Sequence, residues 1–139
     1  MAVAKWATPG SRSSNFAGSP SVFNSLANGS ESDVVTYDNS TNRNLYGAVT
    51  LKLGSITPSS GGSVTLRVTM SDGTDVSNKA GGDFYTSVLL SGASAKVVIW
   101  PMVRIYPFSL RFSLINNSGV TLASSGNEIY VTPYNEDVS

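Results

Sequence analysis

The side chains that most often carry out covalent or metal chemistry are missing from this chain, since its 139 residues include no cysteine and no histidine. Thiols and imidazoles supply the usual nucleophiles, general bases and soft metal ligands. Glycoside hydrolysis would need two carboxylates at one site, and no sequence pattern brings two together here. The candidates for such a pair would be Asp75, Asp83, Glu128 and Glu136. We therefore expect no catalytic residue, no enzymatic activity and no cofactor.

Oxygen ligands for a calcium ion come close together in one segment, Asp72-Gly-Thr-Asp75, with Asp83 following a glycine pair. Calcium takes about six to eight oxygen ligands, and this spacing fits no established calcium loop. Asp-Gly is also a common β-turn dipeptide. The segment predicts a turn, and calcium binding by these three aspartates is left as an alternative.

Binding is the function that the remaining side chains favour. Trp6, Phe16 and Phe23 are isolated large apolar residues within a polar segment, where a partner's pocket would explain them best. Arg104 and Arg111 flank Pro107 and could pair with acidic residues of a neighbouring chain. A solvated strand face explains these two arginines equally well. We take the five residues Trp6, Phe16, Phe23, Arg104 and Arg111 as candidates for partner binding.

A sugar-binding platform is the second kind of binding site that the sequence allows, because flat aromatic faces stack on the apolar faces of sugar rings. Such a platform would be drawn from Trp6, Tyr46, Tyr85, Trp100, Tyr106, Tyr130 and Tyr134. Trp100 ends a Val-Val-Ile run, which predicts that it is buried.

Charge excludes two classes of partner. Nine basic residues balance nine acidic ones, and charged residues make up 13% of the chain, about half the usual share. We therefore expect no nucleic acid and no acidic membrane surface as a partner. The longest apolar stretch, residues 97–115, contains two prolines and two arginines and cannot span a membrane. A weakly charged surface suits packing against other chains.

The chain that carries these candidate residues is predicted to fold mainly as β-strands. Residues 1–31 show no helical or strand period and are predicted to form an extended N-terminal arm, whereas residues 32–139 form the folded domain. Alternating apolar residues separated by turns predict strands at 32–38, 45–53, 63–70, 83–90, 96–100, 107–115, 120–123 and 128–132. About eight short strands indicate an all-β fold, an antiparallel β-sandwich of jelly-roll type. The predicted core includes Val64, Leu66, Val68, Met70, Phe108, Leu110, Phe112 and Leu114.

The C-terminal third also resembles a known group of proteins. Its packing and turn residues are Arg104-Ile-Tyr-Pro107-Phe-Ser-Leu-Arg111-Phe-Ser-Leu-Ile-Asn116-Asn-Ser-Gly119, then Ser125-Gly126-Asn127 and Tyr134-Asn-Glu136. Within residues 101–136 the chain is similar to small virion structural proteins of tailed bacteriophages, of the head decoration or cement type.

That resemblance implies a sandwich on the capsid surface of a virion, bound to the major capsid protein and to identical copies, commonly as a homotrimer. It also implies an arm that grips neighbouring capsid subunits. Attachment to the phage tail is left open. A carbohydrate- or receptor-binding β-module of a phage tail or adhesin is the alternative function.

Overall fold

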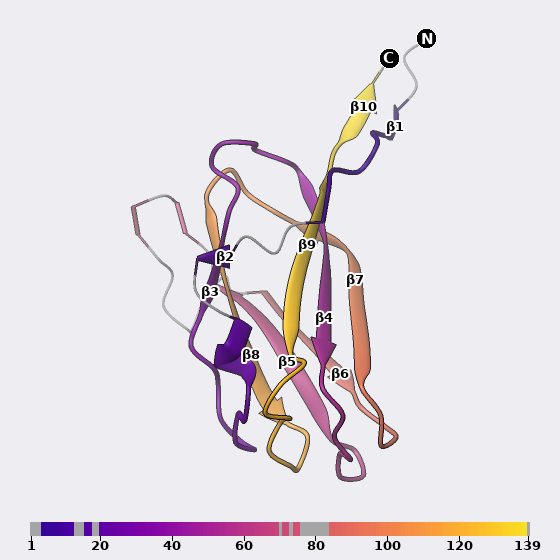
Figure 1. Cartoon of the computed structure of the whole chain (residues 1–139). Helices are drawn as coiled ribbons and strands as arrows, with labels where there is room; N and C mark the ends of the chain where they lie inside the picture. Colours follow the sequence, from indigo (N-terminus) through magenta and orange to yellow (C-terminus); the bar gives the residue numbers. More distant parts are fainter. Residues whose placement is uncertain are drawn as a thin grey trace.

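Residues 4–12, 16–17, 20–69, 71–72, 74–75 and 84–138 are described by the structure, a computed structural model, and nearly all of its regular elements are strands (Figure 1). One short 3-10 helix, η1 (Pro20–Phe23), precedes the main sheets. The strands are β1 (Ala4–Trp6), β2 (Phe16–Ala17), β3 (Val35–Asp38), β4 (Tyr46–Leu53), β5 (Ser63–Thr69), β6 (Phe84–Leu89), β7 (Lys96–Arg104), β8 (Ser109–Asn117), β9 (Glu128–Tyr134) and β10 (Glu136–Val138).

The strands form two antiparallel sheets packed against each other, which confirms the predicted all-β sandwich. One sheet has the order β2-β3-β8-β5-β6 and the other the order β7-β4-β9. From β3 to β9, every connection except that of β5 to β6 passes from one sheet to the other, which is the jelly-roll pattern. Strands β1 and β10 pair separately, in a ribbon that extends away from the sandwich and carries both chain ends (Figure 1).

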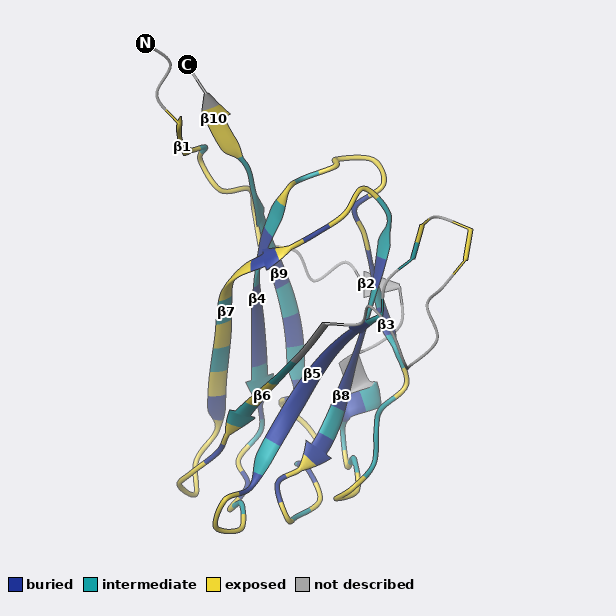
Figure 2. Cartoon of the chain, turned by 180° about the vertical axis from the view of Figure 1, so that it is seen from behind, coloured by how far each residue is buried: buried dark blue, intermediate teal, exposed yellow. Residues whose placement is uncertain are grey.

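Strict alternation places the core where the sequence predicts it (Figure 2). Six of the eight predicted core residues are buried, namely Val64, Leu66, Val68, Leu110, Phe112 and Leu114. Burying each such side chain stabilises the fold by about 1.5–3 kcal/mol. The prediction was wrong for Phe108, which precedes β8 and is half-buried outside the core cluster. Met70 lies outside the described residues.

One predicted strand is absent, and another ends later than predicted. No strand forms at 120–123, because the amide of Asn116 donates to Leu26 O and Val120 O, both at 2.8 Å, and holds this segment as an irregular loop. Strand β7 continues through Pro101, whose missing N–H is tolerated because β7 is an edge strand. The β4–β7 register shifts opposite this proline, between Gly47 and Val49.

The predicted arm is shorter than residues 1–31, because its second half belongs to the sandwich. Phe23 is 0% exposed and lies in the hydrophobic core. The backbone N–H groups of Ser25 and Gly29 donate to Ala123 O (3.0 Å) and Asn116 O (2.6 Å). The predicted boundary at residue 31 was therefore wrong in this part, and an extended, largely exposed course is seen for residues 4–12.

Candidate functional site

Three aromatic side chains meet where the terminal ribbon leaves the sandwich. Tyr46 of β4 and Tyr134 of β9 are register partners, and their rings stack with centroids 5.5 Å apart. Trp6 of β1 stands edge-on to both rings, 5.6 Å from Tyr46 and 5.4 Å from Tyr134. We call Trp6, Tyr46 and Tyr134 the aromatic cluster. Trp6 keeps 53% of its surface exposed, so the cluster has an open face.

Charged groups border the aromatic cluster. The guanidinium of Arg104 lies 5.3 Å from the Tyr46 ring centroid and donates to the Tyr46 hydroxyl at 3.3 Å. That hydroxyl donates to a carboxylate oxygen of Glu136 at 3.0 Å. Partial burial, and then the neighbouring Tyr46, raise the pKa of Tyr134, whose hydroxyl donates to Pro101 O at 2.8 Å. The cluster therefore offers aromatic surface together with a cation and an anion.

The chain segment 4–12, which we call the arm, follows β10 and then the edge strand β9 of the three-stranded sheet. In the ribbon, Lys5 is opposite Asp137 and Trp6 is opposite Glu136. Beyond it, the N–H groups of Ala7 and Gly10 donate to Asn135 O (2.9 Å) and Pro133 O (2.8 Å). The arm ends with the Arg12 guanidinium 3.4 Å from the Tyr130 ring centroid. A shallow pocket of about 350 Å³ lies beside the ribbon, lined by Ala4, Lys5, Trp6 and Glu136.

A second exposed feature is apolar. Edge strand β7 presents Val97, Ile99 and Met102, each more than half exposed. Val97 and Ile99 are register partners of Lys52 and Thr50, so both point away from the core. We call Val97, Ile99 and Met102 the β7 strip.

The five candidate binding residues do not share one surface. Trp6 and Arg104 both contact the ring of Tyr46. Arg104 therefore already has a partner within its own chain. Arg111 belongs to β8 in the other sheet and is thus away from the cluster. Phe23 was wrongly expected on a partner, because its own core encloses it. Phe16 pairs with Tyr37 through its backbone, and its side chain lies outside the described residues.

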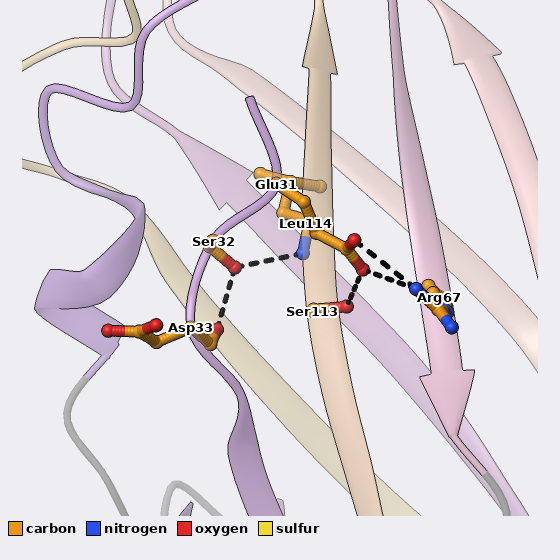
Figure 3. Close-up of polar contacts among 6 residues, drawn as sticks. All are labelled: Glu31, Ser32, Asp33, Arg67, Ser113 and Leu114. Carbon is orange, nitrogen blue, oxygen red and sulfur yellow. Dashed lines mark hydrogen bonds and ion pairs between the residues drawn. The ribbon is translucent and has the colours of Figure 1, made fainter. Parts of the chain in front are cut away.

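Sequence reasoning missed a polar cluster on the outer face of the five-stranded sheet (Figure 3). Arg67 of β5 is only 3% exposed and donates to both carboxylate oxygens of Glu31, at 2.9 and 3.2 Å. Ser113 of β8 donates to the same carboxylate at 2.7 Å. Strand alternation in the sequence places Arg67 on the outer face of the sheet. It does not show which residue covers Arg67 there. The cluster joins residue 31 to two strands and is structural.

The calcium site that the sequence leaves as an alternative would use Asp72, Asp75 and Asp83. Asp72 accepts hydrogen bonds from the backbone N–H groups of Thr74 (2.9 Å) and Asp75 (2.7 Å), and these bonds lower its pKa. Its carboxylate therefore forms the predicted turn. Asp83 lies outside the described residues, and within the described ranges no group of three metal-ligating side chains is found.

Comparison with known proteins identifies no relative of this chain. No protein-family model, curated protein or solved structure matches the chain. In the part of the chain that the structure describes, no helix is long and apolar enough to cross a membrane.

Proposed function

We propose that this chain is a non-enzymatic structural protein of a virion, a decoration or cement protein that binds the outside of a phage head and stabilises it. The observation that carries the proposal is the β7 strip. Three large apolar side chains project from one edge strand and stay more than half exposed in the single chain. Contiguous exposed apolar surface on a folded domain marks an interaction site.

The position of the strip supports a protein partner. An edge strand leaves one row of backbone groups without a neighbouring strand in its sheet, and natural proteins normally protect such edges with charge or cover. On β7, Lys96 and Arg104 stand at the two ends, whereas the exposed side chains between them are uncharged. The major capsid protein is the proposed cover for this surface.

The test is binding to phage heads prepared without this chain, from the phage that encodes it. The wild type should bind and raise the temperature at which the heads fall apart. The double variant Val97→Thr and Ile99→Thr should bind at least about tenfold more weakly, because each buried methyl-bearing side chain contributes more than 1 kcal/mol. Leu45→Thr is the control, since Leu45 is also an exposed apolar residue but lies outside the strip. Absence of binding, or equal occupancy by the double variant, would contradict the proposal.

The aromatic cluster favours a second candidate function, which is recognition of a glycan as part of a receptor-binding module. Trp6 is half exposed, and Glu136 and Arg104 lie near enough to Tyr46 to offer hydrogen bonds beside it. Sugar recognition commonly combines an aromatic face with such polar groups. A glycan array probed with the wild type and with Trp6→Ala, in the absence of any capsid, distinguishes this function. Binding that is lost in Trp6→Ala would favour it over decoration.

A further inference from the structure

The arm has little of its own surface buried in the single chain. Of residues 4–12, Ala7 alone is half-buried and the others are exposed. Its main side-chain contacts are those of Trp6 in the aromatic cluster and of Arg12 over Tyr130. Holding a residue in one backbone conformation costs about 1–2 kcal/mol in conformational entropy. Releasing the arm from its own sandwich therefore costs little.

The ribbon that begins the arm is also exposed to solvent. Among the described strands, β1 pairs with β10 alone, over three residue pairs, and the ribbon projects beyond both sheets (Figure 1). A two-stranded ribbon in water is marginally stable on its own.

We infer that the arm is exchanged between copies of this chain: residues 4–12 of one copy pair with β10 and contact Tyr46, Tyr130 and Tyr134 of a second copy. This inference goes beyond the proposed function and does not depend on capsid binding.

The site that receives the arm is complementary to it in shape and charge. Lys5 faces Asp137 across the ribbon, and Trp6 fits edge-on against Tyr46 and Tyr134. Every contributing residue belongs to this chain, so a second copy supplies an identical site. Exchange of an identical element is a low-cost route to an oligomer because no new contact has to be created. A second copy therefore offers the arm the same contacts that its own sandwich does.

The absence of cysteine allows a direct test. Two single variants, Lys5→Cys and Asp137→Cys, are made with different masses, mixed at high micromolar concentration and oxidised. Register partners in an antiparallel pair are close enough for a disulfide. If the arm crosses, Cys at position 5 of one copy meets Cys at position 137 of another, and the mixed disulfide is the main product on a non-reducing gel.

A matched mixture of Ser63→Cys and Asn117→Cys is the control, because these register partners lie within the sandwich and meet only inside one chain. A mixed-disulfide yield equal to that of the control pair would overturn the inference. So would a wild type that sediments as a monomer at the same concentration. Loss of head binding with the mixed disulfide retained would instead count against the proposed function alone.

Discussion

Tyr46 and Tyr134 lie directly opposite each other on β4 and β9, and their rings stack with 19° between the planes. This pair forms the surface against which Trp6 of the arm rests edge-on. Aromatic pairs of this kind contribute about 0.5–1.5 kcal/mol beyond the area that they bury. The contact of β1 with β9 thus depends on the rings of Tyr46 and Tyr134, which belong to the sandwich.

Replacing Trp6 by alanine should release the arm without unfolding the sandwich. We expect tryptic cleavage after Arg12 to become about three- to tenfold faster, because the arm loses roughly 1 kcal/mol of contacts and opens more often. The free energy of unfolding should change little, since Trp6 is 53% exposed. Mass spectrometry of a limited digestion measures the rate. Tyr106→Ala, at an exposed aromatic residue outside the cluster, should cleave like the wild type.

Truncation should separate the arm from the part of the N-terminal segment that folds with the sandwich. Deleting residues 1–12 should leave a folded protein, whereas deleting residues 1–30 should not, because Phe23 fills the core. Phe23→Ala should cost about 3–5 kcal/mol in the free energy of unfolding. Circular dichroism and urea denaturation test all three variants. A cooperative, wild-type-like transition after deletion of residues 1–30 would refute this account.

The ion pair between Glu31 and Arg67 should behave as a buried pair. Glu31→Gln should destabilise the fold by about 3 kcal/mol, because the guanidinium keeps its charge and its burial but loses its carboxylate. Combining Glu31→Gln with Arg67→Met should recover much of that loss, since the buried charge is then gone. Urea denaturation of the two single variants and the double variant gives the coupling. Additive effects would show that the two side chains do not act as a pair.

Gly54 should tolerate no side chain. A Cβ atom there would lie 2.2 Å from the backbone oxygen of Ser125, which cannot rotate away, and 2.7 Å from the Ala123 Cβ. Gly54→Ala should therefore cost about 3 kcal/mol. Gly61→Ala is the comparison, since Gly61 has φ +74° and open space around it, so it should lose about 1 kcal/mol from backbone strain alone. Thermal unfolding should rank the two variants in this order.

Acid sensitivity should arise in part from Asp38. Its pKa is lowered by hydrogen bonds from the side chain and backbone of Ser40. A lowered folded-state pKa means that the stabilisation is present above the unfolded-state pKa and is lost as pH falls through the folded-state value. Asp38→Asn should thus flatten the acid limb of the stability profile and leave the alkaline limb unchanged. Urea midpoints measured from pH 7 down to the acid transition test this, and an unaltered acid limb would count against it.

The alternation of the central strands can be read directly from the order of their residues. Val49, Leu51 and Leu53 on β4 face the core, as do Leu110 and Phe112 on β8, because successive side chains of a strand point to opposite faces. That rule is local, so it can be applied before any pairing is known. The sequence also indicated a sandwich of short antiparallel strands, because turn residues recur at close intervals along the chain.

Which isolated residues belong to the core and which form a surface depends on the folded chain as a whole. Trp6 and Phe23 have the same polar sequence context, yet the first is half exposed in the aromatic cluster and the second is completely buried. Arg67 looks like an outward, solvated residue until Glu31 is brought beside it. These outcomes depend on strand order and on the return of the chain over the sheet. Both are set by the packing of the whole core, and neither can be read from the alternation of residues within one strand.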